Sequence, residues 1–401
     1  MSQRAWVVVF SGFGVNLALG FFYAWGMIAS ALVDHLGWKA IETQIPYMVA
    51  SILFALSMIP GGRLQDRRGP RLPLRIAGIL AGTGFSLASR FLSVPGLTIF
   101  FGVLFGLAMG FGYAAPTPAA VKWFHPQNRG LISGIVVSGY GLAPLYIAPL
   151  SHSLLVRYGI SGTFLFFALI LTSVLVLCSF FITNPPSGAS PVLLRFGRKT
   201  TPPAERDYSV TEMLHSGNFF LLWMLFFLGT FSGLLVIGQM SKIAQEVAGL
   251  EQGFLSVMLY AVANFLGRLS WGFFSDRVGR KRSLLLAFAI QAVVFFIFER
   301  MTNPVLLLLA KAGVGFTFGG MLALFPAICA DYFGLKNLGL NYGVLFTAWG
   351  VGGVIGPFIG GLSRDLTGGH TLSFFLSGCA SVLGIVLTTM LRPKRESISE
   401  R

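Results

Sequence analysis

The chain has 401 residues, of which 55% are hydrophobic and only 11% charged, and 39 of them are phenylalanine. This composition excludes a water-soluble globular protein, because most side chains cannot face water. The formal net charge is +15, but the basic residues gather in loops on one side of apolar segments, which argues against a nucleic-acid partner.

Continuous apolar segments of roughly 20 residues, the length that a helix needs to cross a hydrocarbon core, follow one another from end to end. Because they are unbroken and rich in Leu, Phe and Gly, they favour helices over the alternating strands of a β-barrel. We therefore expect an all-α membrane protein whose first span is retained. The twelve predicted spans are 6–33, 41–64, 72–91, 96–120, 128–156, 161–183, 217–243, 252–274, 283–299, 303–330, 340–363 and 371–391.

The basic residues predict the orientation of these spans. Of the 29 Lys and Arg, 20 fall on one side of the membrane, six on the other and three inside spans, namely Arg75, Arg268 and Lys311. The positive-inside rule then places both termini in the cytoplasm. We expect a multi-pass protein of the cell (inner) membrane.

This orientation predicts the labelling of two introduced cysteines. Cysteines at Gly188 and Ser397 are expected to stay unmodified when an impermeant thiol reagent is added to intact cells, because the membrane shields them. Permeabilised cells provide the positive control. Modification of either site from outside would overturn the orientation.

The longest polar stretch, residues 183–210, is rich in proline and basic residues and separates six spans from six. The expected domains are an N-terminal six-helix bundle at 1–183, a cytoplasmic linker at 184–212 and a C-terminal six-helix bundle at 213–401.

The two halves repeat one another. GGRLQDRRGPR (61–71) follows the second span and WGFFSDRVGRK (271–281) follows the eighth, with their aspartates 210 residues apart. A second echo, at an offset of 209, pairs Trp123-Phe124, Gly134 and Gly141 with Tyr332-Phe333, Gly343 and Gly350. Two matches at nearly one offset indicate an internal duplication.

We predict that the two repeated loops form a gate. Each aspartate is expected to accept hydrogen bonds from the N-terminal amides of the following helix, while the basic residues face water and can pair with neighbouring helices. The water-facing cluster includes Asp276, Arg277 and Arg280. The predicted gating motif is Gly62, Asp66, Arg67, Gly272, Asp276 and Arg277.

Twelve duplicated spans with a G-x-x-x-D-R-x-G loop after spans 2 and 8 resemble the major facilitator superfamily over the whole chain. The resemblance implies a monomeric secondary transporter in which two halves rock around a substrate site near the midplane. The sequence shows no nucleotide-binding loop, no zinc spacing and no nucleophile paired with a base. We therefore expect neither an enzyme nor a metal or cofactor.

Arg268 stands inside an apolar run, and all 14 acidic residues lie in loops or at span ends. A guanidinium in hydrocarbon costs at least roughly 3 kcal/mol unless it faces a cavity or a partner. A substrate carboxylate suits the planar fork of an arginine. The alternative is that Arg268 snorkels to the cytoplasmic surface.

NFLGRLSWGFFSDRVGR (264–280) resembles span 8 of the oxalate/formate antiporter and monocarboxylate transporter branch, which implies that Arg268 engages the substrate carboxylate. Asn264 stands where several relatives carry a proton-coupling aspartate. Met27 and Trp349 stand where family members carry lysines. The loss of both cations implies a small monocarboxylate rather than a dicarboxylate.

Other substrate-binding residues follow from the same resemblance: Tyr23 and Tyr113 match family tyrosines, and Phe318 and Trp349 are expected as apolar walls. We expect proton-linked transport of lactate-like or pyruvate-like acids. An oxalate/formate-type exchanger, an anion channel and a non-transporting sensor remain alternatives. The roles of Lys311, which could snorkel or face an outer vestibule, and of His152 stay open.

Overall fold

The computed structural model describes residues 2–194, 206–298, 304–367 and 371–391. It places their side chains except at positions 24, 40, 236–257, 304, 361, 364, 365 and 367. The described backbone is almost entirely helical, as continuous apolar spans require in a medium where each backbone N–H and C=O needs an internal partner.

The first half of the chain supplies the helices that end at Phe181. These are α1 (Ser2–Leu19), η1 (Gly20–Ala24), α2 (Trp25–Leu36), α3 (Ala40–Arg68), α4 (Arg71–Ala88), α5 (Val94–Leu97), η2 (Thr98–Phe105), α6 (Gly106–Ala114), α7 (Pro116–Lys122), η3 (Pro126–Asn128) and α8 (Arg129–Phe181). The second half contains α9 (Val210–Leu214), α10 (Gly217–Val278), α11 (Arg280–Phe298), α12 (Pro304–Phe333), α13 (Leu338–Thr367) and α14 (Thr371–Met390).

Two of these helices are long enough to cross a membrane twice. The 53 residues of α8 and the 62 residues of α10 would span about 80 and 90 Å, against a hydrocarbon core of about 30 Å. Within α8 the backbone breaks at Gly159, whose φ of 65° a residue with a side chain rarely adopts. Spans 5 and 6 thus lie in α8, and spans 7 and 8 lie in α10.

The described parts of all twelve predicted spans fall on these helices, within three residues at their ends, and residues 299 and 303 of two spans lie outside the described residues. Nine stretches of the described residues have the length and composition of a membrane span. The prediction of an all-α membrane fold is therefore confirmed. The domain limits at 183/184 and 212/213 stay predictions.

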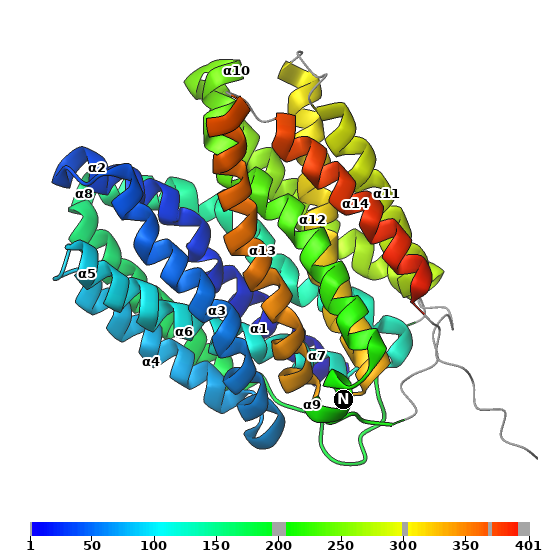
Figure 1. The fold of residues 1–401 in the computed structure, drawn as a ribbon. Helices are drawn as coiled ribbons and strands as arrows, with labels where there is room; N and C mark the ends of the chain where they lie inside the picture. Colours follow the sequence, from blue (N-terminus) through cyan, green and yellow to red (C-terminus); the bar gives the residue numbers. More distant parts are fainter. Residues whose placement is uncertain (1, 195–205, 299–303, 368–370, 392–401) are drawn as a thin grey trace, which may run out of the picture.

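The helices form two bundles that meet along two crossings. In one half α8 packs against α1 and α4, and in the other α10 packs against α12 and α11 against α14. Between the halves, α8 packs against α10 and α3 against α13. The bundles converge at the end that holds α7 and α9 and diverge toward the end that holds α2 and the labelled turn of α10 (Figure 1).

Glycines allow both crossings to be close. A Cβ atom on Gly62 would overlap the carbonyl oxygen of Gly339, and one on Gly272 would overlap the carbonyl oxygen of Gly130. The first contact joins α3 to α13 and the second joins α10 to α8. The glycine of each repeated loop therefore lets its helix touch the backbone of the opposite half.

Candidate functional site

Arg268 lies on α10 at the contact with α8, and its side chain is fully buried. Its Nε donates to Asn264 Oδ1 at 2.8 Å, and its Nη1 donates to the carbonyl oxygen of Val137 at 2.7 Å. Its Nη2 has no hydrogen-bond partner among the described residues. Two protein contacts thus orient the guanidinium, and one nitrogen is left for a further acceptor.

The absence of a side chain at Gly141 makes room for this arrangement. A Cβ atom there would lie 2.5 Å from Asn264 Oδ1 and 3.0 Å from Arg268 Nε. Gly141 belongs to α8, in the opposite half, so the glycine of the second sequence echo accommodates the charged group of α10. Because Arg268 is buried between the halves, the structure disfavours the alternative that it snorkels to the surface.

An aromatic cluster lies beside the guanidinium. The Cζ atom of Arg268 lies 5.8 Å from the ring centroid of Tyr140, within reach of a cation–π interaction. Tyr140 makes edge contacts with Tyr23, at a centroid distance of 5.3 Å, and with Tyr113, at 5.7 Å. The structure therefore gathers the two predicted tyrosines near Arg268, with Tyr140 between them.

The two predicted apolar walls have different positions. Trp349 stacks on Phe346 at 5.1 Å, and Phe346 lies 5.4 Å from Tyr113, so Trp349 belongs to the aromatic cluster. Phe318 is fully buried, but its ring lies against Gly233. Among the described side chains, no contact joins Phe318 to Arg268. The role of Phe318 as an apolar wall of the substrate site stays a prediction.

The gating aspartates bind helix N-termini. Asp276 accepts hydrogen bonds from the backbone N–H groups of Gly130 at 2.8 Å and Leu131 at 2.7 Å, where α8 begins. Asp66 accepts from Gly339 at 3.1 Å and Leu340 at 2.8 Å, where α13 begins. Free N–H groups and the positive end of the helix dipole favour a carboxylate at this place.

These contacts correct one prediction. Each aspartate caps a helix of the opposite half, whereas the prediction named the helix that follows it in the chain. The glycine crossings bring the N-termini of α8 and α13 beside the ends of α10 and α3. The two repeated loops therefore tie the halves together reciprocally.

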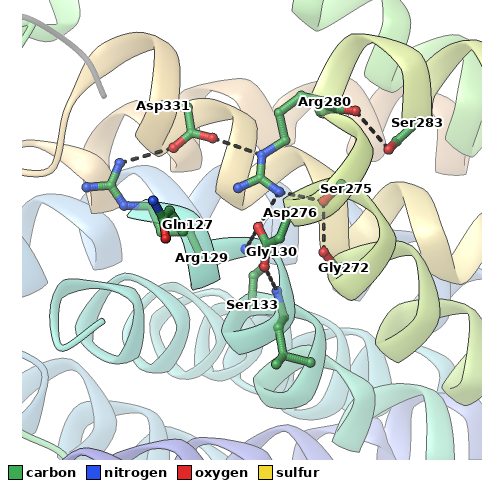
Figure 2. A network of polar contacts seen from close by, with 12 residues as sticks. Gln127, Arg129, Gly130, Ser133, Gly272, Ser275, Asp276, Arg280, Ser283 and Asp331 are labelled. Carbon is green, nitrogen blue, oxygen red and sulfur yellow. Dashed lines mark hydrogen bonds and ion pairs between the residues drawn. The ribbon is translucent and has the colours of Figure 1, made fainter. Parts of the chain in front are cut away.

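An ion-pair network adds to one of the two ties (Figure 2). Asp331 accepts from Arg129 Nη1 at 3.1 Å and from Arg280 Nε at 2.8 Å, while Arg280 Nη1 binds Asp276 at 2.7 Å. Arg129 is the first residue of α8, and Asp331 lies near the end of α12. The Arg129–Asp331 pair therefore joins the two halves. In the other tie Asp66 pairs with Lys122 at 3.3 Å.

The prediction that Asp276 and Arg280 face water is wrong, because both side chains are buried in this network. Arg67 and Arg277 are exposed, and the guanidinium of Arg277 lies over the ring of Phe273 at 4.2 Å. Arg280, four residues after Asp276, is thus one of the basic residues that pair with a neighbouring helix, through Asp331 of α12.

The family model described as Major Facilitator Superfamily matches residues 10–270 and 240–401. The chain belongs to the major facilitator superfamily. It is a membrane transporter and not an enzyme.

Relatives within the superfamily include the oxalate:formate antiporter of Oxalobacter formigenes, which is 30% identical over 93% of this chain and 87% of its own length. Monocarboxylate transporter 13 of Bos taurus is 25% identical over 94% of this chain and 87% of its own length. A double-tryptophan mutant of XylE has a TM-score of 0.80 at 14% identity, covering 98% of this chain and 97% of that one. This last likeness concerns the fold alone.

Three tyrosines of this superfamily member were missed by the sequence reasoning: Tyr140, Tyr260 and Tyr342. Each of the three side chains is buried. A signal for Tyr260 was present, because it precedes Asn264 by one turn of the same helix. For Tyr140 and Tyr342 only the tertiary contacts reveal their place.

Two further titratable residues lie apart from any assigned role. Lys311 is buried, with 1% of its surface exposed, so it does not reach the surface as snorkelling would require. His152 is exposed on α8.

Proposed function

We propose that this chain is a secondary transporter of small monocarboxylates that works by alternating access, with Arg268 as the anchor of the carboxylate. The observation that carries the proposal is the buried guanidinium at the contact between the halves, whose Nη2 lacks an acceptor among the described residues. An unneutralised cation in this place favours an anionic ligand. Two relatives named above are a monocarboxylate transporter and an oxalate:formate antiporter.

A monocarboxylate fits the charges around the site better than a dicarboxylate. Met27 and Trp349 occupy the positions where the resemblance would place lysines, and Trp349 lies in the aromatic cluster. A second carboxylate would there lose its hydration without a compensating cation. The oxalate:formate-type exchanger remains the second candidate, because that relative is 30% identical over most of both chains.

We also propose that transport is linked to protons. Asn264, an amide that does not titrate, binds Arg268 where relatives carry an aspartate. A coupled proton would therefore travel on the substrate carboxylate or on a group outside the midplane, such as exposed His152 or Asp34 and Glu42 in α2 and α3.

The orientation follows from the distribution of basic residues and stays part of the proposal. With both termini in the cytoplasm, the two reciprocal ties lie at the cytoplasmic end of the bundles. The structure then corresponds to a carrier closed toward the cytoplasm, which would act as a monomer in the inner membrane. Substrate would reach Arg268 from the opposite side.

Uptake by the full-length protein in proteoliposomes tests this function. We expect saturable uptake of labelled pyruvate or lactate, counterflow after preloading, and faster uptake when the interior is made alkaline. Stronger competition by oxalate than by pyruvate, with indifference to the pH gradient, would favour the exchanger. Flux that does not saturate would indicate a channel, and the absence of flux would indicate a sensor.

A further inference from the structure

Two asparagines stand directly before the helices that the gating aspartates bind. Asn128 is the N-cap residue of α8, and Asn337 immediately precedes α13. They are 209 residues apart, which is the offset of the second sequence echo. At an N-cap, the side-chain oxygen of an asparagine ordinarily accepts a hydrogen bond from the second or third N–H of its own helix. The side chain of Asn128 makes no such bond.

Both asparagine side chains bind the backbone of the linker instead. Asn128 Oδ1 accepts from the N–H of Leu194 at 3.0 Å, and Asn128 Nδ2 donates to the carbonyl oxygen of Leu194 at 3.4 Å. Asn337 Nδ2 donates to the carbonyl oxygen of Tyr208 at 2.9 Å. Leu194 and Tyr208 both lie in the linker predicted at 184–212, so each duplicated asparagine holds one part of it.

Backbone hydrogen bonds fix the same two parts of the linker. The N–H of Val192 donates to the carbonyl oxygen of Trp123 at 2.9 Å, in the loop before α8. The N–H of Tyr208 donates to the carbonyl oxygen of Phe333 at 2.9 Å, in the corresponding place before α13. The linker is therefore docked in a similar way on the two halves, beside the start of each helix that an aspartate caps.

The amides that the asparagines would ordinarily cap are bound from the opposite half. The second and third N–H groups of α8 donate to Asp276 (Figure 2), and those of α13 donate to Asp66. Each N–H group is a single donor. An asparagine and the aspartate of the opposite half are thus competitors for the same helix end, and the docked linker occupies one of the two competitors.

We propose that the linker sets the strength of the two ties by holding Asn128 and Asn337 away from their own helices. While the linker is docked, the aspartates are the acceptors of the two helix ends, and the halves stay together. An asparagine that the linker releases caps its own helix in place of the aspartate, which lowers the cost of separating the halves. The inference rests on the alternating access of the proposed function, because it concerns how the closed end opens.

Serine and alanine at position 128 separate capping from docking. Neither side chain can make the two bonds of the asparagine amide to Leu194, so both variants lose this contact with the linker. Serine caps a helix N-terminus and alanine does not, a difference that corresponds to about a fivefold change in an equilibrium constant. We therefore expect the open state to be about fivefold more populated in Asn128→Ser than in Asn128→Ala. Asn337→Ser and Asn337→Ala provide an independent pair, with the same order expected.

The rate at which N-ethylmaleimide modifies a cysteine at Ser133 measures this opening. Ser133 is fully buried on α8, where it donates to a carbonyl oxygen of α12 in the opposite half. The measurement uses the full-length protein without its native cysteines. Serine also strengthens the start of α8 itself, so a faster rate with serine than with alanine cannot come from fraying of that helix.

Two controls accompany the pairs. Asn218 lies inside the first turn of α10, after its N-cap, and serine and alanine there are expected to give equal rates. Asp276→Asn weakens one tie directly and is expected to speed the modification.

Equal rates for serine and alanine at positions 128 and 337, or faster modification with alanine, would overturn the competition between asparagine and aspartate. If Asp276→Asn is faster in the same experiment, the ties and the proposed transport remain. An unchanged rate in Asp276→Asn as well would overturn the role of the ties in alternating access, and the inference with it.

Discussion

Arg268→Gln is expected to abolish measurable carboxylate binding while the protein inserts at the level of the parent. The variant loses the positive charge and the free N–H groups that would donate to the substrate carboxylate. Hydrogen bonds to charged groups contribute about 1.5 to 3 kcal/mol each, so two of them correspond to a loss of about a hundredfold or more in affinity. Removal of an unneutralised charge from the interior offsets the lost contacts to Asn264 and Val137.

Arg268→Lys separates charge from geometry. A lysine keeps the positive charge but cannot bind Asn264, Val137 and a carboxylate with the planar arrangement of a guanidinium. At least about a tenfold loss of affinity is expected, since about 1.4 kcal/mol corresponds to that factor. For both variants, the concentration dependence of substrate uptake is measured and normalised to the amount of membrane-inserted protein.

Arg75→Gln provides the matched control within a span. Arg75 contacts Ser179 at 3.4 Å and the ring of Phe180 at 5.0 Å, away from the cluster around Arg268. Near-normal transport is expected from this variant. Transport at the wild-type level by Arg268→Gln would refute the anchor.

Asp331→Asn is expected to open the end of the carrier that the two reciprocal ties close. The substitution leaves the buried guanidinium groups of Arg129 and Arg280 without their shared carboxylate. Breaking a buried ion pair by removing one partner costs about 3 kcal/mol or more, which corresponds to about a hundredfold change in an equilibrium constant. Because the Arg129–Asp331 contact exists only while the halves are together at this end, the closed state bears the cost.

A cysteine at Ser133 reports the opening. Ser133 is fully buried on α8 and donates to the carbonyl oxygen of Ala323 on α12. In a background without Cys178, Cys329 and Cys379, Asp331→Asn should speed its modification by N-ethylmaleimide by at least about tenfold, since the reagent reaches it in the open state. An unchanged rate in a folded variant would show that the pair does not hold the gate.

Glu212→Gln is the control for charge removal. Glu212 pairs with Arg206 at 3.5 Å on the protein surface. The hydrogen bonds donated by the backbone N–H and hydroxyl of Ser209 hold the pKa of Glu212 below its ordinary value. An exposed pair of this kind contributes little, so the modification rate at Ser133→Cys should not change.

How much of this could be predicted differs between the fold and the site. The spans and the internal duplication could be predicted from the sequence, because a hydrocarbon environment imposes length and apolarity on each helix separately. The importance of Arg268 could be predicted for the same reason, since a lone charge in an apolar run is costly wherever the helix packs. The Asp-Arg loops were found as a repeat, but their partners were not.

The sequence by itself determined the helical membrane fold, the six-plus-six organisation and the position of Arg268, which lacks a counter-charge within the spans. Only the tertiary structure decided which groups meet: Asp66 with the N–H of Leu340, 274 residues away, Arg280 with Asp331, and Tyr140 beside Arg268. The physical reason is that apolarity and charge act within one segment. Contacts between distant helices depend instead on where glycines allow two backbones to touch, and neither crossing can be derived from one helix alone.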